Sequence, residues 1–215
     1  GYLVAHLILN TLLIHIPFLV ALVTGDLLAG EANSGTFRFI LSRPVGRAEL
    51  VTAKFAAGLV YTFMLILFMM LLSLLVGRFI LGTGDLLVIR EKINIFSQDD
   101  VLWRFLLAYL HGFVTMTVVA ALSLLLSALA DNGIGPIIGT VAIIIGLSII
   151  LTVAGSLLGP ARDFIFTSHL SKWQLFFDYE LDRAAIRQSF AVLLAYLALF
   201  YVATLYIFRK KDILS

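Results

Sequence analysis

The chain has 215 residues, of which 61% are hydrophobic and 13% charged, and its formal net charge is +2. Soluble domains contain about 45–50% apolar and about 25% charged residues, so this composition excludes a soluble enzyme. The mild positive charge gives no indication of nucleic-acid binding. With no cysteine in the chain, a disulfide framework and a thiolate metal site are excluded too.

Five long apolar blocks predict five membrane-spanning helices. A helix needs about 20 apolar residues to cross a hydrocarbon core of about 30 Å, and the blocks lack the alternation of a barrel strand. We therefore expect an all-α polytopic bundle that forms a single transmembrane domain over residues 1–215. The predicted spans cover residues 2–23, 55–76, 101–130, 137–158 and 189–208.

The connections between the spans differ in character. Residues 25–54 and 78–100 are polar, and a short turn rich in glycine follows the third span. In the connection 159–188, Leu170, Trp173 and Phe177 recur at helical spacing. This pattern predicts either a helix in the membrane interface or a re-entrant segment, or a loop helix packed on the bundle.

The orientation rests on the basic residues. Nearly equal numbers of lysine and arginine fall on the two sides, so the positive-inside rule is undecided by count. The cluster Arg209-Lys210-Lys211 directly after the last span favours a cytoplasmic C-terminus. Residues 25–54 are then cytosolic, and residues 78–100 and 159–188 are external.

The cytosolic loop contains signals for a short helix. Asn33 or Ser34 is a suitable N-cap, and Phe37, Ile40 and Leu41 share one helix face. Pro44 would end this helix, because the residue before a proline avoids the α region. A short amphipathic helix between two spans either lies on the membrane or docks a partner.

This loop resembles the first intracellular loop of ABC-2 type transporter permeases. The matching positions are Glu31, Gly35, Thr36, Leu41, Arg43, Pro44, Arg47 and Lys54, and the closing residues 208–213 are also similar to that family. Members have six spans, so we expect the five spans to be the last five, with an N-terminal segment missing before Gly1.

The resemblance implies a coupling helix that docks on a separate ABC ATPase subunit. The residues it assigns to ATPase coupling are Glu31, Gly35, Thr36, Phe37, Arg38, Leu41, Arg43, Pro44 and Arg47. The arginines would pair with carboxylates of the ATPase or serve as ordinary anchors at headgroup depth.

The chain has no G-x-x-x-x-G-K-[ST] phosphate loop. We therefore expect a non-catalytic permease subunit of an exporter in the bacterial inner membrane, with ATP and magnesium bound by the partner ATPase. A second permease copy, identical or paralogous, would complete the path. No catalytic, cofactor or metal site is predicted in this chain.

Two alternatives remain open. The chain is also similar to permeases of gliding-motility and metalloenzyme-maturation systems. In this alternative it would move no solute, but would anchor a periplasmic or surface partner or transmit force to it. A membrane-embedded, lipid-modifying enzyme would need polar residues clustered at one depth, whereas the spans hold only isolated histidines and hydroxyls.

The histidines are interpreted as structural. His6 and His15 are nine residues apart, on opposite sides of a helix, so they cannot share a ligand. We expect them and His111 to be neutral and hydrogen-bonded to neighbouring helices. His169 has Asp163 nearby in the sequence, but a metal site there is the weaker interpretation.

Overall fold

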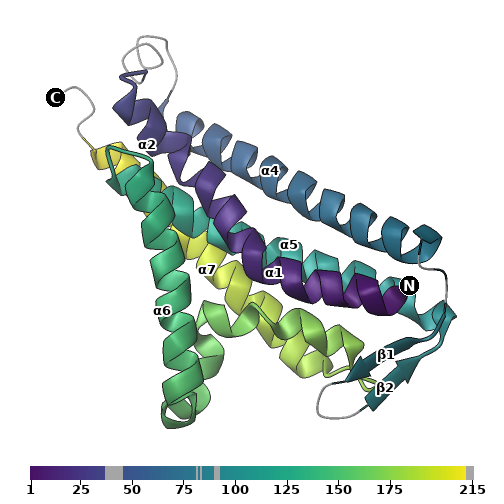
Figure 1. Ribbon diagram of the computed structural model, residues 1–215. Helices are drawn as coiled ribbons and strands as arrows, with labels where there is room; N and C mark the ends of the chain where they lie inside the picture. Colours follow the sequence, from purple (N-terminus) through teal and green to yellow (C-terminus); the bar gives the residue numbers. More distant parts are fainter. Residues whose placement is uncertain (37–45, 81, 83, 90–92, 212–215) are drawn as a thin grey trace.

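The computed structural model describes residues 1–36, 46–80, 82, 84–89 and 93–211 (Figure 1). In this part of the chain, five helical segments are long and apolar enough to span a membrane. The prediction of an all-α polytopic membrane bundle is confirmed. The helices are α1 (Tyr2–Thr24), which continues as α2 (Asp26–Asn33), α4 (Arg47–Leu75), α5 (Gln98–Leu129), α6 (Ile134–Leu158) and α7 (Arg183–Lys210).

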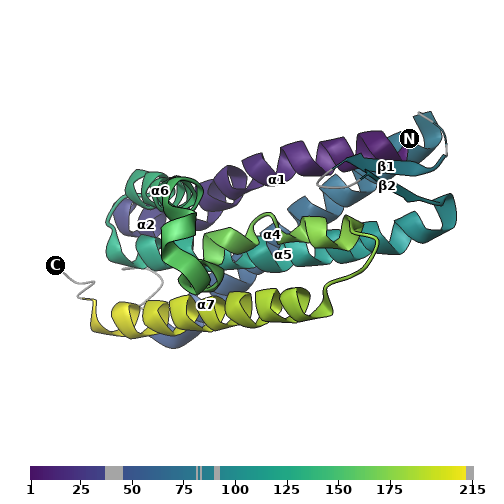
Figure 2. The same cartoon turned by 90° about the horizontal axis from the view of Figure 1, so that it is seen from below.

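Helix α5 is the central element of the bundle. It packs against α1, α4, α6 and α7, and Figure 2 shows it between α1 and α7. In its most apolar window 72% of the residues are buried, against 11% for α6 and for α7. The peripheral helices therefore leave most of their apolar side chains for lipid or for another protein.

The two ends of the bundle have different structures. One end holds α2, the start of α4, the α5–α6 turn and the end of α7 (Figure 1); we call it the coupling end. The opposite end holds a β-hairpin and three short helices, and we call it the hairpin end.

The polar loop at the coupling end is shorter than residues 25–54. Asp26–Asn33 is helical and α4 already begins at Arg47, so only residues 34–46 connect the two helices. Of the two predicted N-caps, Asn33 is the last residue of α2 and Ser34 is its C-terminal cap; the helix that they were predicted to start lies outside the described residues. Charged residues at a helix end outside the hydrocarbon do not interrupt the helix, so hydropathy alone ended the first span too early.

The connection 78–100 contains secondary structure that the polar composition did not predict. A π-helical turn, η1 (Val76–Ile80), continues α4, and β1 (Leu86–Ile89) pairs antiparallel with β2 (Ile93–Phe96). Leu86 and Phe96 face each other and are buried, whereas the adjacent pair Leu87 and Ile95 is exposed. One face of the hairpin thus covers the hairpin end of the bundle.

The connection 159–188 folds as three short 3-10 helices, η2 (Gly159–Phe164), η3 (Phe166–His169) and η4 (Lys172–Phe177). Trp173, Phe176 and Phe177 are 2%, 3% and 0% exposed and belong to the main hydrophobic core. The aromatic side chains are therefore packed on the bundle. Of the alternatives considered from the sequence, this agrees with a loop helix packed on the bundle.

Candidate functional site

The loop 34–46 is bounded by two helices that an ion pair joins directly. The Lys54 ammonium on α4 contacts a carboxylate oxygen of Glu31 on α2, and both side chains are about one fifth exposed. Glu31 and Lys54 are 23 positions apart in the sequence. Both belong to the set of positions that resembles the first intracellular loop of ABC-2 type permeases. The ion pair joins α2 to α4 beside the two ends of the loop.

Gly35 and Thr36 end α2 through backbone geometry. Gly35 has φ +67°, in the left-handed region where a side chain is unfavourable. The Thr36 N–H donates to the Glu31 carbonyl (3.1 Å), and the Gly35 N–H donates to the Ala32 carbonyl (3.2 Å). These two bonds form a Schellman motif, so the Gly-Thr pair determines where the helix stops and the loop begins.

Arg47, the first residue of α4, contacts the end of α7. Its Nη1 atom donates to the backbone carbonyls of Arg209 (3.0 Å) and Lys211 (2.7 Å). Of the other residues predicted for ATPase coupling, Phe37, Arg38, Leu41, Arg43 and Pro44 lie outside the described residues, as does the predicted coupling helix itself.

Two further contacts at the coupling end were not predicted. Lys211 Nζ lies 2.9 Å from both the Ala130 carbonyl at the end of α5 and the Asp131 carboxylate. Ser127 Oγ on α5 accepts from the backbone N–H groups of Leu28 (3.1 Å) and Ala29 (2.9 Å) at the start of α2. Both contacts join residues about 80 to 100 positions apart, so no local sequence pattern indicates them.

Together these four contacts form a closed ring of helix ends. α2 is joined to α4 by Glu31–Lys54, α4 to α7 by Arg47, α7 to the end of α5 by Lys211, and α5 back to α2 by Ser127. We call this set the coupling-end ring. The ring joins the ends of α2, α4, α5 and α7 through polar contacts.

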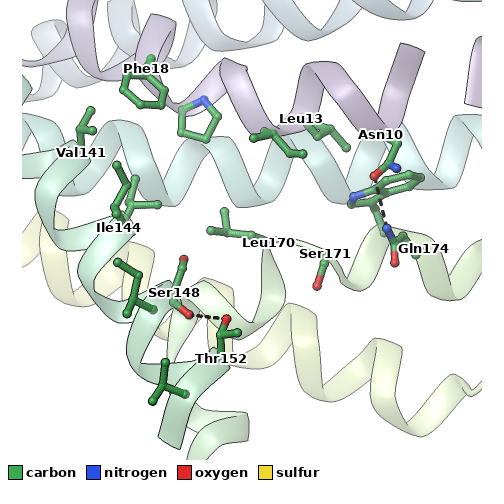
Figure 3. A pocket seen from close by; sticks show the side chains of 16 residues that line it. Asn10, Leu13, Phe18, Val141, Ile144, Ser148, Thr152, Leu170, Ser171 and Gln174 are labelled. Atoms are coloured by element: carbon green, nitrogen blue, oxygen red, sulfur yellow. Dashed lines mark hydrogen bonds between the residues drawn. The ribbon is translucent and has the colours of Figure 1, made fainter. Parts of the chain in front are cut away.

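A cavity of about 700 Å³ lies between α1 and α6, next to η4 (Figure 3). Apolar side chains from both helices form most of its walls. Polar groups line it in two places: Gln174 donates to Asn10 (3.4 Å) next to η4, and Ser148 and Thr152 lie on α6 (Figure 3). Ile14, Ile149 and Val153 at its rim are 66%, 56% and 78% exposed. The cavity is therefore a groove open to the lateral surface of the bundle.

A family model described as "ABC-2 family transporter protein" matches residues 4–213, nearly the whole chain. The chain belongs to the ABC-2 transporter family. A Bacillus subtilis protein named "Uncharacterized protein YhcI" is 25% identical over 208 residues. That alignment covers 89% of this chain and 63% of the relative, so the chain spans less than two thirds of that protein's length.

In this ABC-2 permease, His111 and His169 are buried, His6 is partly buried and His15 is exposed. His111 Nε2 on α5 lies 2.9 Å from the Ser189 hydroxyl on α7, as expected of a histidine bonded to a neighbouring helix. His15 contacts the Thr11 carbonyl of its own helix, so the expected bond to a neighbouring helix is wrong for this residue. His6 packs against the rings of Trp173 and Phe177. Among the described residues, no group of three or more metal-binding side chains occurs.

Proposed function

We propose that this chain is the membrane subunit of an ATP-driven exporter, and that loop 34–46 docks on a separate ATPase subunit. The observation that carries the proposal is the Glu31–Lys54 ion pair, which joins the two helices at the base of this loop. A load applied to the loop is then received by two spans at once. ATP and magnesium would bind to the partner, and this chain would be non-catalytic.

The same proposal gives the orientation. The coupling end carries Arg47, Lys54, Arg209, Lys210 and Lys211, and clusters of lysine and arginine next to spans favour the cytoplasmic side. The ATPase would meet the permease there, and the β-hairpin would face outward. In a bacterium this places the chain in the cytoplasmic membrane.

The groove between α1 and α6 supports a transported substrate with a large apolar part. Its walls are mostly apolar, a few polar groups lie on α6 and next to η4, and exposed apolar residues form its rim. A second copy of the chain, or a paralogue, seated against α1 and α6 would convert the groove into an enclosed path. Pockets of this kind suit amphipathic molecules.

Isolation of the chain from its native membrane tests the central claim. We expect a P-loop ATPase to purify with it and to hydrolyse ATP in a vanadate-sensitive reaction. The double change Arg38→Glu and Arg43→Glu in the loop should remove the ATPase, because it reverses the charges proposed to face carboxylates of the partner. The matched control, Arg187→Glu on the exposed surface of α7 near the hairpin end, should retain it. If the unaltered chain yields no ATPase, the proposal is wrong.

A further inference from the structure

Arg47 was predicted from the sequence to contact the ATPase, but its partly buried side chain binds the end of α7. The Nη1 atom is within 3.0 Å of the Arg209 carbonyl and 2.7 Å of the Lys211 carbonyl. A guanidinium group in this position is already used as a hydrogen-bond donor within the chain.

The position of Arg47 matches the needs of a helix C-terminus. The last carbonyls of a helix lack partners within the helix, and its C-terminal end carries partial negative charge. Arg47 supplies both a donor and a positive charge there, although it belongs to the first turn of another helix. It therefore caps α7 from α4.

Lys211 repeats this arrangement one helix further on. Directly after the end of α7, its ammonium group donates to the carbonyl of Ala130, the C-terminal cap residue of α5, and pairs with Asp131. The start of α4 thus caps α7, and the end of α7 in turn caps α5. The contacts run in one direction from the loop to the central helix.

We propose that Arg47 and Lys211 are positioning residues that carry a displacement of loop 34–46 first to α7 and then to α5, and that Arg47 is not an ATPase contact. This inference rests on the proposed function. Without the two caps, a load on the loop would reach α2 and α4 through Glu31–Lys54. It would still meet α7 at the hydrogen bond between Thr52 of α4 and Tyr201 (2.8 Å), but not at the last residues of α7, which Arg47 holds.

Hydrogen–deuterium exchange on the purified chain tests the caps themselves. We expect Arg47→Gln to speed amide exchange in the last turn of α7 by about tenfold or more, because hydrogen bonds to charged groups are stronger than neutral ones. Lys210→Gln is the matched control. It removes one positive charge from the same helix end, but the Lys210 ammonium contacts Tyr206 of its own helix. Unchanged exchange in Arg47→Gln would overturn the proposal.

Spin labels test the transmission of movement. The chain has no cysteine, so Ala53→Cys on α4 and Val202→Cys on α7, both exposed, can be labelled selectively. In the complex with the co-purified ATPase, we expect one narrow distance distribution with and without ATP and vanadate. In the Arg47→Gln background, the distribution should broaden or shift on addition of ATP and vanadate, while the amount of bound ATPase stays the same.

The outcomes separate the two proposals. If Arg47→Gln releases the ATPase but leaves exchange at the end of α7 unchanged, Arg47 is an ATPase contact and the inference is wrong. If the unaltered chain brings down no ATPase, the proposed function fails, and so does the transmission role. Arg47→Lys keeps a hydrogen-bond donor and the positive charge, so it should recover most of the protection of the last-turn amides of α7 against exchange. It replaces Arg47→Gln in these experiments if that variant does not fold.

Discussion

The buried hydroxyl of Ser189 on α7 lies 2.9 Å from Nε2 of the buried His111 on α5. The same hydroxyl lies 2.8 Å from Nδ1 of His169, whose Nε2 is 3.0 Å from the Asp163 carbonyl. A carbonyl only accepts, so Nε2 of neutral His169 carries the proton and its Nδ1 accepts from Ser189. The Ser189 oxygen then accepts from His111. In this network His111 donates to Ser189, Ser189 donates to His169, and His169 donates to the Asp163 carbonyl.

Replacement of Ser189 by alanine should destabilise the protein by about 1–3 kcal/mol, because two buried imidazole nitrogens lose their shared partner. Thermal unfolding in detergent, followed by intrinsic fluorescence, measures this loss. Ser156→Ala, at an exposed position of α6, is the control and should change stability little. Equal stability of the two variants would contradict the hydrogen-bond order described above.

The stability contributed by His169 should depend on pH. Burial, reinforced by the positive charge of Lys172, holds the pKa of His169 below its usual value of 6.5, against the opposing influence of Asp163. The unfolded chain therefore binds a proton more readily than the folded chain. The contribution is complete above about pH 6.5 and is lost progressively as the pH falls below that value.

Unfolding temperatures measured between about pH 7.5 and pH 5 check this sign. The difference between the unaltered protein and His169→Gln should shrink toward the acidic end. The imidazole of His111 also meets Ser189, so His111→Gln in parallel identifies which histidine titrates. A difference that stays constant over this range would refute the assignment to His169.

Arg104 should hold the short helix η4 on the bundle. The residue is 5% exposed. Its guanidinium group pairs with Asp100 (3.0 Å) and donates to the carbonyls of Phe176 (2.9 Å) and Asp178 (2.8 Å). We expect Arg104→Gln to cost about 2 kcal/mol and to accelerate limited proteolysis between residues 172 and 180. Arg187→Gln, exposed on α7, should behave like the unaltered protein.

The Glu31–Lys54 ion pair at the base of the loop should tolerate an exchange of its two charges but not a change of one charge alone. Lys54→Glu sets two carboxylates against each other, and Glu31→Lys sets two ammonium groups against each other. Each should lower stability by about 1 kcal/mol, the upper range for a partly exposed pair. The double change restores opposite charges, so a double-mutant cycle of unfolding free energies should show positive coupling. Additive effects would mean that the pair contributes nothing.

A second copy of the chain should cover the groove side of the bundle. Ile145 on α6 is 46% exposed and lines the groove, whereas Leu199 on α7 is 59% exposed and does not line it. Because the chain lacks cysteine, Ile145→Cys should cross-link to a dimer in native membranes and Leu199→Cys should not. Cross-linked dimers are detected on a non-reducing gel. If Leu199→Cys forms them and Ile145→Cys does not, the interface lies on α7 and the prediction is wrong.

The spans could be predicted from the sequence because hydropathy alone determines which segments cross a membrane. The ends of the helices could not, since Asp26 and Lys54 are polar yet helical. The hairpin was missed because its apolar residues sit in a connection with many charges. Glu31 and Lys54 were recognised only as members of a motif, and their contact follows from the packing of α2 on α4.

The ring at the coupling end was the least predictable feature. Ser127 was one of many hydroxyls in apolar helices, and Lys211 looked like an ordinary basic flank. Their roles depend on contacts with backbone groups of distant helices. Backbone acceptors are present at every position, so a sequence carries no pattern that indicates which of them a lysine or a serine will reach.

The pairing of His111 with Ser189 also has a consequence for biogenesis. Helix α5 is synthesised before α7, so it enters the bilayer with the His111 imidazole awaiting its partner. Polar groups without partners are costly in hydrocarbon, so α5 is less stable in the bilayer before α7 supplies the Ser189 hydroxyl. The last described helix therefore completes the polar contacts of the first half of α5.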